Sequence, residues 1–393
     1  MQKLHSMLVA LLRSGLLNVP YQGEILDTLT ENEMGDLISI ASKNDVLQIV
    51  SDVIVRDSLI SDDELMGIFK LSARNAFMRT EKTLYEYNII TKALEEAKIP
   101  FIPLKGSVIR SLYPKEWYRT SCDIDILVRE EDIQRAREYV ENTLGYTYDK
   151  EASHDISFFT KTGVHIELHF SLIEENSLHL GDKRKWNADP LSYVWQDATQ
   201  KDGWEYFYEM SCENFYLYHI AHMAKHFEGG GCGLRTICDL WLIDNAYNGD
   251  VNSRNTVLKA CRLDKFSSYA SDLSKVWFGD MEHTDITLFL QNYIISGGVY
   301  GNVDNNITYK QNKKGGKSGY IFYRIFMPYD VLKYLYPSLQ KHKWMYPFYT
   351  VRRWIERLLF GKKVKKSLKE LNLVSKGDTE DKSTSDYLRE IGL

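Results

Sequence analysis

Acidic residues alternate with apolar residues in one short segment of the chain, Asp123-Ile124-Asp125-Ile126-Leu127-Val128. If this segment is a β-strand, both aspartates point to one face and the isoleucines point to the other, into a core. Two carboxylates one pleat apart repel each other unless a cation lies between them. The spacing therefore predicts a strand that binds a metal ion.

A second segment, Val164–Phe170, repeats the alternation, with His165, Glu167 and His169 on its polar face. Three carboxylates on adjacent strands can hold two Mg²⁺ ions, with Mn²⁺ as an alternative, while water and substrate phosphates complete the coordination. Two such ions can clamp the attacking and leaving oxygens of a phosphoryl displacement. We therefore predict that Asp123, Asp125 and Glu167 are the metal ligands and the catalytic residues.

A Lys105-Gly106-Ser107 turn upstream supplies candidate phosphate contacts. It follows an apolar run, Ile99–Leu104, that we interpret as a strand, and it precedes a helix expected from Ser107 to about Tyr113. A glycine lets the backbone approach a phosphate, and the N–H groups that begin a helix attract one. Lys105 either adds a positive charge there or points away from the site.

These segments belong to an α/β block predicted over 99–175. Cys122–Val128 is its second strand, and a helix from Asp132 to Leu144 ends at Gly145. Ser157–Thr160 and Val164–Phe170 form a hairpin. Residues 1–98 are predicted to be helical, including one long helix from about 62 to 97 with a single apolar face.

The remaining chain is expected to be mainly helical. Residues 176–301 form a helical domain facing the cleft, with helices over Phe215–Phe227 and Leu234–Tyr247. The polar, glycine-rich stretch 302–319 is predicted to be a loop or linker. An aromatic and basic helical segment, 320–370, and a mobile tail, 371–393, follow.

Composition restricts the class of protein. The chain has 393 residues, a formal charge of −5 and 44 % hydrophobic residues, which is typical of a globular protein and not of one that coats DNA. The longest uncharged stretch is too polar to span a bilayer, and we find no signal peptide. Five cysteines in no disulfide or zinc pattern favour reduced thiols. We expect a cytoplasmic protein.

Residues 341–370 carry ten Lys or Arg against two Glu, with aromatic residues between the charges. Three interpretations stay open. The segment is a solvated helical face, or it contacts the inner face of the membrane as a peripheral surface, or it binds RNA with bases stacked on its aromatic rings.

The run IPFIPLKGSVIRSLYPKEWYRTSCDIDILV, with the later HIELHF strand, resembles the polymerase-β-type nucleotidyltransferase superfamily. It is most similar to a bacterial branch described as uncharacterised nucleotidyltransferases, and the similarity covers roughly 85–360. The positions that match the branch are Leu104, Lys105, Gly106, Tyr113, Pro114, Arg119, Asp123, Asp125, Glu167, His169, His219, His222, Arg235 and Asp239. The step from Gly106 to Asp123 is longer than is usual in the superfamily.

The resemblance implies a polymerase-β-like α+β core, a small mixed sheet with helices, inside a mainly helical protein. It implies transfer of a nucleotidyl group from a nucleoside triphosphate, such as ATP, to an acceptor, with release of pyrophosphate. In that scheme Glu167 also accepts the nucleophile's proton. The implied nucleotide-binding residues are Lys105, Gly106, Ser107, Arg119, His219 and Arg235.

Several points have two interpretations. His219, His222 and His226 either bind a metal or are cleft and core histidines, and we favour His219 as a cleft residue near the nucleotide. Gly229–Gly233 is either a phosphate loop or, as we favour, a turn between helices.

The acceptor and the biological role also stay open. Net acidity favours a small molecule or sugar phosphate as the acceptor over RNA. A nucleotide-binding regulator without turnover, and a toxin-like enzyme that modifies RNA or protein, are the alternative functions.

Overall fold

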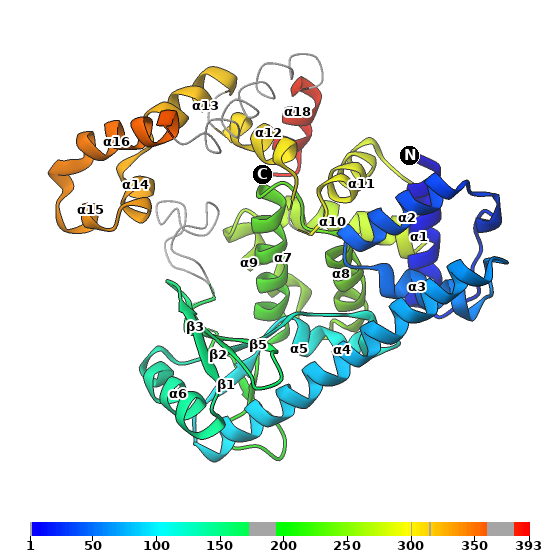
Figure 1. The fold of residues 1–393 in the computed structure, drawn as a ribbon, viewed down its shortest axis with the longest axis horizontal. Coiled ribbons are helices and arrows are strands. Elements are labelled where there is room, and N and C mark those ends of the chain that lie inside the picture. The colour runs from blue at the N-terminus through cyan, green and yellow to red at the C-terminus, as the bar shows by residue number, and fades with distance from the viewer. Residues whose placement is uncertain (1, 173–193, 300, 314–315, 360–380) are drawn as a thin grey trace.

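The computed structural model describes residues 2–172, 194–299, 301–313, 316–359 and 381–393. Within these ranges the protein is mainly helical around one small mixed sheet, so the predicted α+β class is confirmed. Figure 1 shows the N-terminal helices at one side and the sheet at the lower edge, joined by one long diagonal helix.

The N-terminal region is helical, as predicted. Thr30 and Glu33 form a reciprocal capping box that fixes the start of the second helix. The long helix begins after Asp62, whose side chain accepts a hydrogen bond from the Leu65 amide. It contacts both the third N-terminal helix and the second strand of the sheet. The four helices are α1 (Gln2–Leu17), α2 (Glu31–Lys43), α3 (Leu47–Arg56) and α4 (Asp63–Glu96).

The sheet has five strands in the order β1-β2-β5-β4-β3. Only the central pair, β2 and β5, is parallel, and the other pairs are antiparallel. The apolar side chains predicted for one face, among them Ile124, Ile126 and Ile166, are fully buried. The strands are β1 (Phe101–Pro103), β2 (Asp123–Val128), β3 (Thr147–Glu151), β4 (Asp155–Phe159) and β5 (His165–His169).

Short helices connect these strands. The helix expected from Ser107 to Tyr113 is two shorter pieces, α5 (Gly106–Ile109) and a 3₁₀ turn (Arg110–Leu112). The predicted 132–144 helix is α6 (Ile133–Tyr139) continued by a π-helical turn (Val140–Leu144), and it ends at Gly145 with φ 66°. The hairpin turn contains Gly163 at φ 81°. Strand β3 is an addition that the sequence analysis did not predict.

Helices α7 (Cys212–Glu228) and α8 (Leu234–Ala246) confirm the predicted pair. The intervening glycines form a turn, because Gly230 and Gly233 have positive φ and a Cβ on Gly230 would lie 2.5 Å from the Asn302 carbonyl. The other elements between 194 and 299 are β6 (Thr199–Gln200), β7 (Tyr208–Glu209), α9 (Val251–Ala260), α10 (Asp264–Phe278) and α11 (Asp285–Gly297).

The prediction of a loop over 302–319 is wrong. Two helices, α12 (Val303–Lys313) and α13 (Gly316–Ile325), occupy most of it. The Asn302 side chain accepts a hydrogen bond from the Asn305 amide at 2.7 Å, and so caps the first turn of α12. Tyr309 of α12 then hydrogen-bonds to Glu228 of α7. Polar residues interpreted as linker are thus caps and buried partners.

The prediction of a mobile tail is also wrong for the part of it that is described. Residues 381–390 form α18 (Asp381–Glu390), and residues 371–380 lie outside the described residues. Leu388 and Ile391 are fully buried, and Tyr387 stacks on Phe289 of α11. A few apolar side chains within a charged segment are enough to dock this helix.

The aromatic and basic segment is helical up to the end of its described part. Its helices are α14 (Tyr329–Leu335), α15 (Ser338–Lys341) and α16 (Tyr346–Leu359). Among the described residues we find no helix that is both long and apolar enough to cross a membrane.

Candidate active site

The parallel pairing of β2 with β5 brings the predicted acidic residues together. Asp125 lies opposite Glu167 in the register, and Asp123 lies opposite His165. All four side chains share one face, because residues two apart on a strand point the same way. The other face packs into the hydrophobic core, so the sheet holds these polar groups on a rigid support.

His169 lies between the two carboxylates. Its Nε2 atom is 2.9 Å from Asp125 Oδ1 and 3.4 Å from Glu167 Oε2. The donor atoms of these three residues lie within 4.8 Å of one another. Asp125 and His169 are almost fully buried, whereas the Glu167 side chain keeps 22 % of its surface exposed. The site therefore opens on the side of Glu167.

Lys105 supplies a second cation. Its ammonium lies 3.3 Å from Asp125 Oδ1, so the side chain points into the site and not away from it. Its backbone has φ 40°, a conformation that non-glycine residues rarely adopt. Such strain is typical of functional positions held by their surroundings. We refer to Lys105, Asp123, Asp125, Glu167 and His169 as the carboxylate cluster.

Burial and charge act in opposite directions on the two aspartates. Burial raises the pKa of Asp123, and repulsion from Asp125 raises it further. Burial also opposes ionisation of Asp125, but Lys105 and His169 hold the pKa of Asp125 well below its usual range. Burial would lower the pKa of His169, yet its hydrogen bonds to Asp125 and Glu167 raise it to about 9. The cluster thus holds excess negative charge.

Helix α7 covers the cluster with an aromatic side chain that sequence reasoning missed. Tyr218 is buried near Lys105, and burial raises the pKa of its hydroxyl. One turn later on the same helix, burial and then the nearby Lys105 charge lower the pKa of His222. His222 and His226 lie with their Nε2 atoms 3.2 Å apart. In the sequence, the four-residue spacing of His222 and His226 already indicates that they share one helix face.

The α7 histidines belong to none of the groups of three or more potential metal ligands found among the described residues. These groups are Asp125–Glu167–His169 and His154–Asp155–His169. His219 is buried, and its Nε2 lies 3.4 Å from the Thr236 carbonyl of α8. The predicted metal ligand Asp123 lies on the correct face, but one pleat away from the convergent set.

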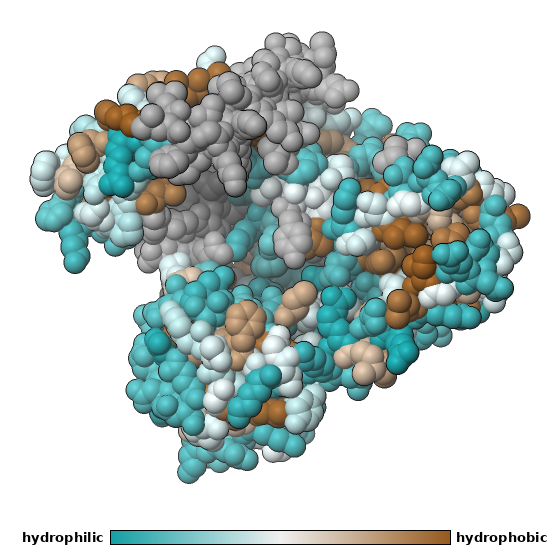
Figure 2. All heavy atoms as spheres, viewed as in Figure 1, coloured by the Kyte–Doolittle hydropathy of each residue, from teal (hydrophilic) through white to brown (hydrophobic). Residues whose placement is uncertain are grey.

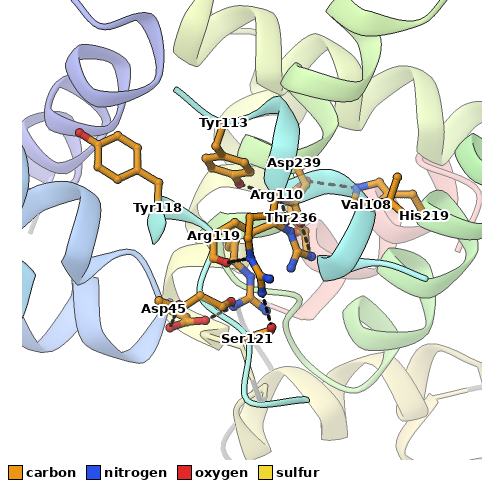
Figure 3. A network of polar contacts seen from close by, with 12 residues as sticks. Asp45, Val108, Arg110, Tyr113, Tyr118, Arg119, Ser121, His219, Thr236 and Asp239 are labelled. Atoms are coloured by element: carbon orange, nitrogen blue, oxygen red, sulfur yellow. Dashed lines mark hydrogen bonds and ion pairs between the residues drawn. The ribbon is translucent and has the colours of Figure 1, made fainter. Parts of the chain in front are cut away.

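A second polar group surrounds the segment that leads into β2 (Figure 3). Arg119 makes two hydrogen bonds with Asp239 of α8, Nε to Oδ1 at 2.9 Å and Nη2 to Oδ2 at 3.0 Å. The Tyr113 hydroxyl donates to the same carboxylate at 2.7 Å. Burial opposes the ionisation of Asp239, but Arg119 lowers its pKa. This buried pair attaches the loop before β2 to α8.

Arg235 makes a similar attachment on the other side of the loop. It forms an ion pair with Asp45, and its Nη1 donates to the Thr120 carbonyl at 2.8 Å. Thr120 in turn donates to Asp45 at 3.0 Å. We refer to Asp45, Tyr113, Arg119, Arg235 and Asp239 as the arginine network. It ties two distant segments, the one that follows α2 and helix α8, to the start of β2.

The predicted nucleotide-binding residues therefore divide into two sets. Lys105 contacts the carboxylate cluster directly, and Gly106 and Ser107 follow it in the chain. Arg119 and Arg235 have carboxylate partners in the network. Arg119 also approaches the turn, because a Cβ on Gly106 would lie 2.7 Å from Arg119 Nη1. A larger residue at position 106 would displace the buried guanidinium, which Asp239 holds in place.

The donors of the cluster fit a divalent cation, because two carboxylates and an imidazole converge on one partly open volume. A small mixed sheet that carries such a cluster, set among helices, defines an α+β nucleotidyltransferase-type core. A family model described as "Uncharacterised nucleotidyltransferase" matches residues 30–279, and the chain belongs to this family. Searches of curated proteins and of solved structures found no match.

Proposed function

We propose that the protein transfers a nucleotidyl group from a nucleoside triphosphate to an acceptor hydroxyl or phosphate in a Mg²⁺-dependent reaction. The observation that carries this proposal is the register of Asp125 opposite Glu167, with Asp123 on the same face. A family of nucleotidyltransferases provides the reaction class. A small molecule or sugar phosphate is the acceptor we favour.

The reaction forms a bond between the acceptor oxygen and the α-phosphorus. The bond from the α-phosphorus to the bridging oxygen breaks, and pyrophosphate leaves with the electron pair. Two bound divalent ions would neutralise charge on the phosphates and lower the barrier to this displacement. Asp123, Asp125 and Glu167 would hold them. Glu167, the most exposed member of the convergent set, would take the proton of an acceptor hydroxyl.

The β- and γ-phosphates would lie at the Lys105–Ser107 turn. The Lys105 ammonium points toward the carboxylates and so lies where a metal-bound phosphate would meet it. Arg119 uses Nε and Nη2 for Asp239, which leaves Nη1, beside Gly106, as the atom that would face a phosphate. Arg235 and His219 would act more remotely, by fixing the loop and α8.

Calorimetric titration of ATP, GTP, CTP and UTP into the full chain, with and without Mg²⁺, tests the proposal. We expect Mg²⁺-dependent binding of at least one nucleotide in the wild type and loss of binding in Asp123→Ala/Asp125→Ala. Asp280→Asn, a fully exposed carboxylate, is the matched control and should bind as the wild type does. Binding that persists in the double variant would contradict the site. Binding without turnover on any acceptor would favour a regulator.

A second proposal concerns the arm formed by α13–α16. Four large apolar side chains are exposed along α16 and the turn before it, at positions spaced four, three and four residues apart. Figure 2 shows hydrophobic residues on the surface of this arm. The four residues are Trp344, Phe348, Val351 and Ile355, with exposed fractions of 78, 60, 48 and 50 %. This spacing places the three α16 residues on one helix face.

We propose that this face contacts an anionic membrane surface. Lys341, Lys343 and Arg352 are exposed beside it, and their charge complements anionic headgroups. Aromatic residues at an interface suit either lipid or RNA, but the aliphatic side chains of Val351 and Ile355 offer no ring on which bases stack. The mixture of aliphatic and aromatic side chains therefore favours lipid.

Co-sedimentation with vesicles of phosphatidylcholine, with or without phosphatidylserine, tests this contact. We expect binding to the anionic vesicles only, weakened about tenfold or more by Trp344→Ser/Phe348→Ser. Tyr85→Ser, which removes an exposed aromatic ring from α4, is the control and should leave binding unchanged. Equal sedimentation of all variants, or loss of RNA binding instead of vesicle binding, would contradict the membrane proposal.

A further inference from the structure

His169 is the one nitrogen donor in the convergent group formed with Asp125 and Glu167. It is 3 % exposed, and β5 carries it on the same face as Glu167. Its register partners, Leu127 on β2 and Asp155 on β4, lie on the strands to either side. The imidazole is therefore held by a central strand with a neighbour on each side, and its Nε2 atom is directed at the carboxylates.

The geometry of the group distinguishes two positions along the carboxylate cluster. Asp125, Glu167 and His169 converge on one volume, with ligand atoms within 4.8 Å of one another. Asp123 lies one pleat further along β2, opposite His165. A cation held between Asp125 and Glu167 would thus meet the His169 nitrogen, whereas a cation nearer to Asp123 would meet carboxylate oxygens.

The donor types favour different ions at these positions. Mg²⁺ takes oxygen ligands and keeps much of its water, whereas imidazole is a common ligand of transition-metal ions. Mn²⁺ accepts carboxylate oxygen and imidazole nitrogen together. Lys105 approaches Asp125 Oδ1, the same oxygen that His169 contacts. An ion bound to His169 Nε2 would replace the proton of the His169–Asp125 hydrogen bond, because imidazole binds a metal in its neutral form.

We propose that His169 Nε2 is a direct ligand of the metal ion held by Asp125 and Glu167, and that this position selects Mn²⁺ over Mg²⁺. The inference rests on the proposed nucleotidyl transfer with two bound ions. It assigns Mn²⁺ to the position between Asp125 and Glu167 and leaves the position nearer Asp123 to Mg²⁺. The alternative is a positioning role, in which His169 orients Asp125 through a hydrogen bond and never contacts the ion.

Electron paramagnetic resonance of Mn²⁺ added to the full-length protein tests the ligand assignment without any turnover. We expect hyperfine coupling from an imidazole nitrogen in the wild-type spectrum. This first measurement uses the wild-type protein alone, so it does not depend on whether a variant folds. The coupling should disappear in His169→Gln. It should persist in His165→Gln, a matched control on the same strand and face, whose Nδ1 lies 3.6 Å from Glu167 Oε1.

Calorimetry with Mn²⁺ and Mg²⁺ on the same proteins tests the selectivity. We expect His169→Gln to weaken Mn²⁺ binding by at least about tenfold and Mg²⁺ binding much less. Circular dichroism and thermal unfolding would establish that the variant is folded.

The possible failures are distinguishable. Bound Mn²⁺ without nitrogen coupling, or coupling lost only in His165→Gln, would overturn the His169 assignment and leave the proposed function intact. Absence of Mn²⁺ and Mg²⁺ binding, with nucleotide present or absent, would overturn both.

Discussion

Two groups of buried carboxylates lie near the start of β2, and their partners differ. In the arginine network, Asp239 is matched by the two-point guanidinium contact of Arg119 and by the Tyr113 hydroxyl. The carboxylate cluster has five members, of which three are acids and only two, Lys105 and His169, are bases. The network is therefore neutralised within the fold, whereas the cluster keeps negative charge that a metal ion would neutralise.

This comparison separates two roles that the sequence pattern does not distinguish. Charged residues of both groups, such as Asp125 and Asp239, match one family pattern. The network holds the loop that precedes β2, and its arginines contact that loop and α8. The cluster carries donor atoms that converge on one volume. The difference predicts opposite responses to substitution.

Loss of a carboxylate from the cluster should have the largest effect, and that effect should be on activity. Asp123→Asn is expected to lower the rate of nucleotidyl transfer about a thousandfold, because metal stabilisation of the reacting phosphates is worth several kcal/mol. The same variant should raise the free energy of unfolding of the metal-free protein by about 1 kcal/mol, since burial and Asp125 disfavour the ionised Asp123 carboxyl. Steady-state kinetics and urea unfolding in chelator check the two effects.

A decrease in metal-free stability, with activity retained, would place Asp123 with the structural residues instead. Asp280→Asn serves again as the surface control and should change neither quantity.

Loss of an arginine from the network should act on stability. Arg119→Met is expected to lower the free energy of unfolding by about 3–5 kcal/mol, because it leaves Asp239 buried without its cation. The double variant Arg119→Met/Asp239→Leu should recover most of that loss, since neither charge then remains buried. Urea unfolding of the three proteins measures both steps. A double variant no more stable than Arg119→Met would show that the unpaired buried charge of Asp239 is not the cause of the loss.

Removal of one hydroxyl from the network should have a smaller effect. Tyr113→Phe deletes the hydrogen bond to Asp239 while Arg119 stays in place. We expect a cost of about 1.5–3 kcal/mol, typical of a hydrogen bond to a charged group. Thermal unfolding provides the measurement. An unchanged melting temperature would mean that Arg119 alone satisfies the carboxylate.

The smallest effect should be the contribution of the network to acid sensitivity. Arg119 lowers the pKa of Asp239 against the opposing effect of burial, so its ionised form stabilises the folded state. This contribution is fully present above the unfolded pKa of about 3.9 and is lost as the pH falls through the lower folded pKa. We therefore expect the free energy of unfolding, measured in urea from pH 7 down to acidic pH, to fall less steeply in Arg119→Met/Asp239→Leu than in the wild type. Parallel curves would refute the assignment.

Some of the site follows from local rules that any strand obeys. The two-residue repeat placed Asp123 with Asp125, and Glu167 with His165 and His169, before any pairing of strands was known. Helices α4, α6, α7 and α8 follow from apolar periodicity and from glycines at helix ends. These inferences succeed because they depend on near neighbours in the chain.

The errors have a shared physical origin. The 302–319 segment and the tail were judged by polar composition, yet Asn302 caps a helix and Leu388 and Ile391 are buried against distant partners. Composition reports the average surface preference of a segment. It does not report the few side chains that decide whether the segment docks.

The sequence by itself determined the alternating faces, the helix periods and the chemical types present at the site. Only the tertiary structure decided that β2 lies parallel to β5 with Asp125 opposite Glu167, and that Arg119 pairs with Asp239, 120 positions later in the chain. Strand register and long-range ion pairs depend on the packing of the whole core, because many pairings satisfy the local pattern equally well. That packing made one set of charged residues a structural network and left the other set as a candidate metal site.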